Sequence, residues 1–205
     1  MKNLFAILVM LIVLNEPVYT QQFEGGLQGG FNASQVDGDR NAGYNKLGFN
    51  GGVFLHYVLP DKQHSIGFDL MYMGKGSRNR RDPEGLDPIL IYSYHYVELP
   101  LYYRYIHKKF AFRSGLTWAY VFSSKFDDGG SAKEIIGLRN VDYLWHCGGE
   151  YAFNEQFALF IGYEYSIRTI IKRDFYLLPS PIDQFRRNGV YHNLIQVSLK
   201  YNFTK

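Results

Sequence analysis

The chain has 205 residues, of which 46% are hydrophobic and 18% are aromatic, and its formal net charge is +3. This length fits a single domain, and so small a net charge without a basic stripe excludes a nucleic-acid partner. The single cysteine, Cys147, excludes an internal disulfide bond.

The N-terminus has the pattern of a secretory signal peptide. Lys2 supplies a positive charge, the residues from Leu4 to Leu14 are all apolar, and a polar break leads to Thr20. An apolar run of this length is too short to cross a bilayer, which takes about 20 residues. We therefore expect residues 1–20 to be removed on export and residues 21–205 to form the mature domain.

Eight segments of alternating polarity follow. In residues 157–168 the odd positions are Phe, Leu, Ile and Tyr, whereas the even positions include Gly, Glu, Ser and Arg. Successive side chains of a strand point to opposite faces, so each segment has one apolar face and one small or charged face. The expected strands are residues 23–34, 46–59, 65–75, 91–105, 110–122, 141–153, 157–168 and 190–203.

The connections between these segments alternate in length. Short breaks fall at about 60–62, 106–109 and 154–156, and long ones at about 35–45, 76–90, 123–140 and 171–189. This rhythm predicts an all-β fold, an eight-stranded antiparallel up-and-down transmembrane β-barrel in an outer membrane. The short turns and both termini then face the periplasm. Pro100 cannot donate a backbone hydrogen bond, which predicts a bulge or an unpaired amide in the fourth strand.

A soluble lipocalin-like ligand carrier is the structural alternative, because it also combines eight strands with a signal peptide. Such a barrel would turn its apolar face inward, around a ligand. Here the apolar face consists mostly of large residues, and an eight-stranded barrel is just wide enough inside to be filled by side chains. The small and charged face suits that interior better, so we expect the apolar face, including Cys147, to meet lipid.

The inward face carries acids and bases in nearly equal number. Buried charges cost several kcal/mol each unless they are paired, so we expect a salt-bridged, non-conducting interior and not a proton or ion path. Lys75 and Asp142 lie on the same faces. The predicted lumen charge network consists of Glu24, Asp69, Glu98, Arg104, Arg113, Glu150, Glu164, Arg168 and Lys200.

Several short motifs resemble one known family. Residues 67–76 read Gly-Phe-Asp-Leu-Met-Tyr-Met-Gly-Lys-Gly, residues 96–101 read Tyr-Val-Glu-Leu-Pro-Leu, and residues 148–151, 163–167 and 197–203 fall in its later strands. On these motifs the chain resembles the PorT-like outer-membrane β-barrel proteins of Gram-negative bacteria. The resemblance implies an outer-membrane barrel. The namesake is tied to secretion of cell-surface proteases, so a protein of a secretion or envelope system is one expected partner, although that role is not carried over.

The last strand also predicts a partner in assembly. Val197, Leu199, Tyr201 and Phe203 alternate with polar residues up to the C-terminus. This ending resembles the alternating aromatic signal read by barrel-assembly machinery, which we expect to insert the chain.

The sequence contains no recognisable catalytic set. Lipid A-modifying barrel enzymes pair His with Ser and an acid, but no histidine here has an evident Ser partner. His146 shares a strand face with Asp142 and Glu150, which fits either a proton relay or an ordinary interior set of hydrogen bonds. No metal-ligand spacing is present, so we expect no enzyme activity, metal or cofactor, with a lipid A-modifying enzyme as the alternative function.

Two of the long loops carry clusters of basic residues. Arg side chains suit phosphate groups, and the outer leaflet of such membranes carries lipopolysaccharide. The competing interpretation is that these are solvated loop charges, neutralised by nearby acids. We expect binding or scaffolding through the loops, with outer-membrane lipid and lipopolysaccharide as partners. The candidate binding residues are Arg78, Arg80, Arg81, Lys172, Arg173, Arg186 and Arg187.

Overall fold

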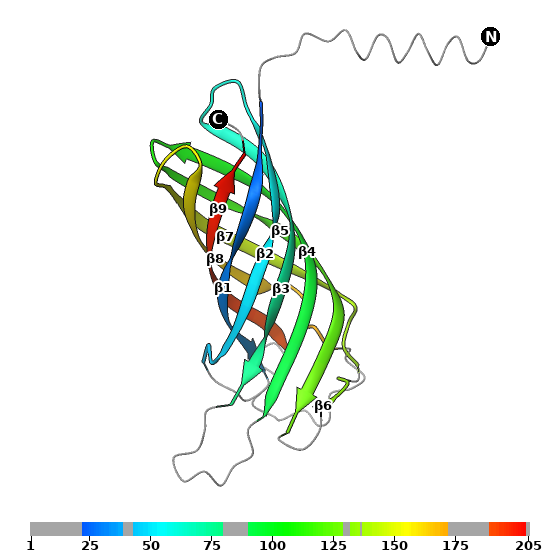
Figure 1. The fold of residues 1–205 in the computed structure, drawn as a ribbon. Coiled ribbons are helices and arrows are strands. Elements are labelled where there is room, and N and C mark those ends of the chain that lie inside the picture. The colour runs from blue at the N-terminus through cyan, green and yellow to red at the C-terminus, as the bar shows by residue number, and fades with distance from the viewer. Residues whose placement is uncertain are drawn as a thin grey trace, which may run out of the picture.

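Alternating segments pair into one closed antiparallel sheet (Figure 1). The computed structural model describes residues 22–38, 43–79, 90–128, 132–135, 137–171 and 189–203, so the expected signal peptide lies outside the described residues. The eight barrel strands in this part of the chain are β1 (Phe23–Asp37), β2 (Lys46–Val58), β3 (His64–Arg78), β4 (Ile91–His107), β5 (Phe110–Asp127), β7 (Val141–Ala152), β8 (Phe157–Ser166) and β9 (Tyr191–Asn202).

The barrel is closed by the first and last strands. The sheet order is β4-β3-β2-β1-β9-β8-β7-β5, and β4 also pairs with β5, so each strand has a neighbour on both sides. The two-residue strand β6 (Ala132–Lys133) only extends the pairing at the end of β5. The predicted eight-stranded antiparallel barrel is therefore confirmed.

The one bulge lies away from the position that the sequence suggested. The register between β4 and β5 shifts between His95 and Tyr96, which leaves Phe122 as the extra residue. At Pro100 the register with β3 does not change, but pairs are missing between Phe68↔Leu101 and Met71↔Glu98. Of the two expected outcomes at Pro100, the interrupted ladder is found and the bulge is not, because the missing N–H removes one bond without adding a residue.

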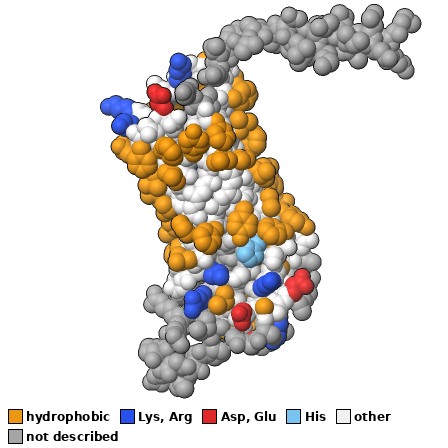
Figure 2. Space-filling view, viewed as in Figure 1, with side chains coloured by type: hydrophobic (Ala, Val, Ile, Leu, Met, Phe, Trp, Pro, Cys, Tyr) orange, Lys and Arg blue, Asp and Glu red, His pale blue; other side chains and the backbone are white. Residues whose placement is uncertain are grey.

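The two faces of the sheet meet different surroundings. Large apolar side chains such as Phe31 (61% exposed) and Phe49 (65% exposed) point outward. The residue that follows each of them, Asn32 or Asn50, is buried. Figure 2 shows apolar side chains around the wall and charged ones gathered toward both ends. Most large apolar side chains of the described strands point outward and the charges point inward, which is the reverse of a lipocalin and contradicts that alternative.

Short turns join the strands at the end where β1 begins and β9 ends (Figure 1). The β2–β3 and β4–β5 turns place Lys62 (φ 58°) and Lys108 (φ 55°) in the left-handed region. By the rule for outer-membrane barrels this end faces the periplasm, and the long connections face outside. Among the described residues, no helix is long and apolar enough to cross a membrane.

The closure between β1 and β9 can be tested by cross-linking. Leu27 and Tyr201 are direct partners on the outer wall, and directly opposed Cβ atoms lie about 5 Å apart. In a Cys147→Ser background, Leu27→Cys with Tyr201→Cys should form a disulfide on mild oxidation of the folded protein. The matched control is Leu27→Cys with Val197→Cys, since Val197 pairs with Phe31 four residues away. Equal cross-linking of the two pairs, measured on non-reducing gels, would contradict this register.

Candidate functional site

The periplasmic half of the lumen is organised around Asp69. Arg113 Nη1 lies 2.9 Å from Asp69 Oδ2, and Gln28 Nε2 donates to the same oxygen over 2.7 Å. Tyr102 donates to Asp69 Oδ1 over 2.6 Å, so its hydroxyl oxygen accepts from His56 Nε2 at 2.8 Å. Asp69, fully enclosed, thus has both carboxylate oxygens bound by donors from three other strands.

A second ionic group lies beside the first. Lys200 Nζ is 2.7 Å from Glu150 Oε1, and Arg104 Nη2 is 3.0 Å from Glu150 Oε2. Arg104 Nη1 also lies 3.7 Å from Glu24, which in turn faces His56 Nδ1 at 3.7 Å. Three acids and three bases therefore balance each other in this half of the lumen.

Aromatic rings separate these charges, and glycines make room for the rings. The Arg113 guanidinium lies 3.7 Å from the centre of the Phe160 ring, and the Lys200 ammonium lies 4.2 Å from the centre of the Phe54 ring. Gly148 and Gly162 are paired directly, and a Cβ on either would come within 2.5 Å of the Phe160 ring. A side chain at either position would displace the ring from beneath Arg113. The cation–π contacts stabilise charges that have left water.

In the described part of the chain, the extracellular half of the lumen holds Lys75 with three acids, Glu98, Asp142 and Glu164. Lys75 Nζ is 2.5 Å from Glu98 Oε1 and 4.6 Å from the centre of the Tyr96 ring. The charges of Glu164 and Asp142 also act on Lys75. Asp142 accepts a hydrogen bond from Ser166 over 2.6 Å, whereas one oxygen each of Glu98, Asp142 and Glu164 has no partner within the described part of the chain.

An apolar cluster lies among these acids in the extracellular half of the barrel, since Leu194 pairs with Glu164 and Ala119 pairs with Asp142. Its buried members come from β1, β3, β4, β5, β7 and β9 and from the segments beside β8 and β9. Strand alternation places the members that lie within strands on the same face as the lumen charges. The sequence therefore contained this pattern, but the inward face was predicted from its charged residues alone. The members are Val36, Met73, Tyr94, Tyr96, Ala119, Leu144, Ile170, Val190 and Leu194.

Arg168 is the one member of the predicted lumen network that lies elsewhere. β8 ends at Ser166, and Arg168 beyond it is exposed. Strand alternation no longer fixes the direction of a side chain once pairing ends, so the inward assignment of Arg168 was wrong. The other eight members, with Lys75 and Asp142, line the lumen and leave six acids against four bases.

The candidate relay at His146 is also not formed. His146 Nδ1 bonds Thr117 Oγ1 over 2.9 Å, whereas Asp142 bonds Ser166 and Glu150 bonds Arg104 and Lys200. Residues four apart on a strand share a face but lie about 13 Å from each other. That separation is too long for proton transfer between them.

The barrel does bring together a serine, a histidine and an acid that the sequence analysis did not connect. Ser166 Oγ donates to Asp142 Oδ2 and accepts from the backbone N–H of His192 at 3.0 Å. The imidazole Nε2 of His192 instead contacts Tyr96 OH at 3.0 Å. Because the imidazole does not contact the serine hydroxyl, and all three residues are buried, the set lacks the nucleophile–base pair of a hydrolase.

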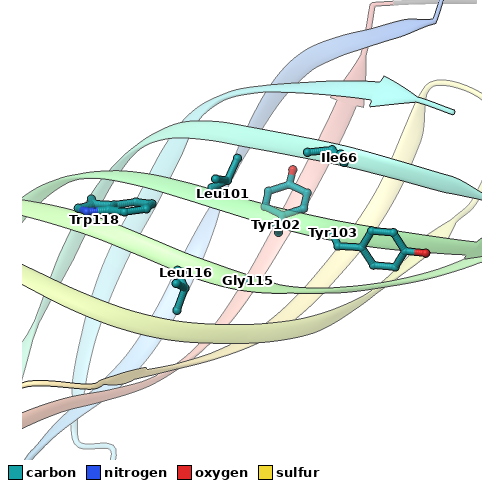
Figure 3. Close-up of a pocket in the computed structure, with 7 residues that line it drawn as sticks. All are labelled: Ile66, Leu101, Tyr102, Tyr103, Gly115, Leu116 and Trp118. Atoms are coloured by element: carbon teal, nitrogen blue, oxygen red, sulfur yellow. The ribbon is translucent and has the colours of Figure 1, made fainter.

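A shallow groove of about 330 Å³ lies on the outer wall over β3, β4 and β5 (Figure 3). Leu101, Leu116, Tyr103 and Trp118 surround it, and Gly115 leaves its floor without a side chain. The lining holds no charged or catalytic group. In the described part of the chain, no cluster of three or more His, Cys, Asp or Glu side chains could hold a metal ion.

Most of the predicted loop residues fall outside the described residues. Arg80, Arg81, Lys172, Arg173, Arg186 and Arg187 lie there, so their binding role stays a prediction. Arg78 is described, and it is the exposed last residue of β3. It therefore belongs to the rim of the barrel wall.

A closed eight-stranded barrel with an apolar outer wall and a charged interior defines the class of outer-membrane β-barrels. The sequence matches the family model of the outer membrane protein beta-barrel domain over residues 15–172. The chain belongs to this family, and it is located in the outer membrane of a Gram-negative bacterium. The match covers the broad family, so the PorT-like assignment stays a prediction. No curated protein matches the chain in sequence.

Two solved structures illustrate the likeness in fold. Neisserial surface protein A (NspA) is 14% identical with a TM-score of 0.56, and the match covers 89% of this chain and 98% of NspA. Ail, the attachment invasion locus protein of Yersinia pestis, is 12% identical with a TM-score of 0.51, and the match covers 89% of this chain and 100% of Ail. At these identities the similarity concerns the fold alone.

The role of Lys75 in the lumen gives a stability prediction. Lys75→Met removes the base that pairs with Glu98 and whose charge also meets those of Glu164 and Asp142, and breaking a buried pair costs about 3–5 kcal/mol. We expect a lower urea midpoint of unfolding in lipid vesicles, followed by the fluorescence of the outward-facing Trp118 and Trp145. Arg168→Gln is the control, because Arg168 is exposed and should leave the midpoint unchanged. Similar midpoints for Lys75→Met and the control would show that Lys75 is not needed to balance these acids.

Proposed function

We propose that the protein is a non-conducting, non-enzymatic outer-membrane barrel that binds or scaffolds a partner through its extracellular loops. The observation that carries this proposal is the content of the lumen. Ion pairs and aromatic rings occupy its periplasmic half, and the apolar cluster lies with Lys75 and its acids in the extracellular half. A channel needs a continuous path for water, and these contacts leave the outer surface as the place where the protein meets other molecules.

Binding at the loops is supported by their composition and by one neighbour. The two basic loops contain Arg80, Arg81, Arg186 and Arg187, whose guanidinium groups suit phosphate, sulfate and carboxylate groups. Ail was crystallised in complex with the heparin analogue sucrose octasulfate, so one protein of this fold binds a sulfated sugar. By this analogy the partner is an anionic molecule at the cell surface: lipopolysaccharide or an acidic protein of a secretion or envelope system.

A lipid A-modifying enzyme is the alternative function, and no specific observation favours it. Such an enzyme needs a nucleophile and a base in contact near the rim. The Ser166–Asp142 contact is enclosed within the lumen and has no imidazole on the serine hydroxyl.

Conductance in planar bilayers tests the non-conducting interior. We expect pure protein at neutral pH to give no discrete current steps, because paired charges and the apolar cluster interrupt any water column. Slower migration of boiled than unboiled samples on SDS gels would verify that the inserted protein is folded. Steady, ion-selective steps from such a sample would show that the charged interior is a pathway.

Replacing the loop arginines tests the binding role. A variant with Arg80, Arg81, Arg186 and Arg187 changed to Ser should lose most of the partner that co-purifies from intact outer membranes. The reason is that it lacks the guanidinium groups that bind phosphate or carboxylate. The control replaces the turn residues Lys108 and Lys109 at the opposite end of the barrel. If the folded loop variant, identified by its normal gel shift, co-purifies with as much partner as the wild type, the proposed binding role of the loops is wrong.

A further inference from the structure

We propose that the outer wall of the barrel carries, at its extracellular end, a binding site for an alkylammonium group. Asp37, Tyr165 and Tyr191 form the site, and Tyr44 and Asn193 support it. These five residues, the tyrosine–acid patch, lie on β1, on the connection that follows it, on β8 and on β9. The site takes a cation and uses none of the basic loop residues, so it does not rest on the loop function proposed above.

The register brings the tyrosine–acid patch together on three neighbouring strands. Asp37 pairs with Tyr191 across β1 and β9. Asn193, two residues further along β9, pairs with Tyr165 on β8. The strands β1, β9 and β8 lie side by side in the wall (Figure 1). Direct partners in a sheet have their Cβ atoms about 5 Å apart, so the carboxylate and the two rings share one small area.

The patch faces outward. Val36 and His192 are buried in the lumen, so their neighbours Asp37 and Tyr191 point to the other face. The rings of Tyr165 and Tyr191 are stacked, with centres 6.0 Å apart and planes 11° from parallel, which places Tyr165 on the same face. Asp37, Tyr165 and Tyr191 are each half-exposed. A ligand outside the wall can therefore reach all three side chains.

Hydrogen bonds hold the carboxylate in place and leave it able to accept more. Gln35 Nε2 donates to Asp37 Oδ1 over 2.8 Å, and Asn193 Nδ2 donates to Asp37 Oδ2 over 3.4 Å. Tyr44 donates to Asn193 Oδ1 over 2.7 Å, which orients that amide. A carboxylate has about four acceptor sites, and an ammonium group carries three donors and no acceptor. The polar edge of the patch thus suits a ligand with N–H donors.

The charge of Asp37 is the second reason for a cationic ligand. Within the described ranges, none of the ion pairs involves Asp37. The carboxylate instead lies among tyrosines, since its charge acts on both Tyr44 and Tyr163. An aromatic girdle accounts for tyrosines at this end of the wall, but not for an acid among them. A bound cation would pair with this acid.

The two stacked rings provide the rest of the site. Faces of aromatic rings attract ammonium groups, and the alkyl stem of an amine packs on apolar surface. A Cβ on Gly189 would come within 2.6 Å of the Tyr191 ring, so the glycine lets this ring lie against the main chain. A carboxylate beside nearly parallel rings therefore matches both parts of an alkylammonium ion. A free amine and a lysine side chain share this chemistry.

Binding of butylammonium to the protein in neutral detergent, followed by saturation-transfer NMR, tests the proposal. Asp37→Asn keeps the shape of the side chain and removes its charge. We expect its affinity to fall about tenfold, which is the effect of one charge-assisted hydrogen bond. The variant Tyr165→Leu, Tyr191→Leu should bind at least about fivefold more weakly, because two cation–π contacts are lost. The wild type should bind n-butanol, which has the same stem without the charge, as weakly as Asp37→Asn binds butylammonium.

Two matched controls change the same groups elsewhere. Glu155→Gln removes one negative charge from an exposed turn at the periplasmic end, and Tyr120→Leu removes an outward ring from β5. Both should keep the wild-type affinity, as should the loop variant, which separates failure of this site from failure of the loop function.

Equal affinities of Asp37→Asn and Glu155→Gln, both heat-modifiable on gels, would overturn the proposal. Equal binding of butylammonium and n-butanol by the wild type would overturn it as well, and this comparison needs no variant to fold. Cadaverine and Nα-acetyl-lysine amide distinguish the two sources of the ligand. Preference for cadaverine assigns the site to free amines, and preference for the lysine derivative assigns it to a protein partner. Binding of neither compound would contradict the assignment to an alkylammonium group.

Discussion

The constraint on which this structure depends is that lipid offers no hydrogen-bond partner to the backbone. Every strand must therefore be paired on both sides, which the β1–β9 and β4–β5 ladders achieve by closing the sheet. Closure with eight strands fixes a narrow interior. Each side chain on a strand then points either toward lipid or into the lumen. The single interruption in the β3–β4 ladder occurs at Pro100, whose residue type cannot donate the missing bond.

The narrow interior holds two ionic groups, and apolar side chains pack only in its extracellular half. Asp69 and Glu150 each gather donors from several strands, so the ion pairs connect parts of the wall that are not adjacent in the sheet. The apolar cluster in the extracellular half needs no such partners and packs by contact. A barrel cross-connected in this way is a rigid frame, and rigid frames suit sites held on their rims.

The strands and their faces were predictable because both follow from a local period of two residues. Expected and observed strands begin within one residue of each other, and β5 ends later than expected because the bulge at Phe122 allows the ladder to continue to Asp127. The contacts between lumen residues were less predictable. His146 was grouped with Asp142 along one strand, yet its partner is Thr117 on the neighbouring strand, because the shortest distances in a barrel run across strands.

The sequence by itself determined the strand pattern, the lipid or lumen face of residues within the strands, and the short-turn and long-loop ends. These properties depend on side-chain alternation and hydrophobicity, which are local. Only the tertiary structure decided which acid meets which base and that Arg168 lies outside the lumen. Such groupings depend on the register between strands distant in the sequence, and closure of the barrel sets that register.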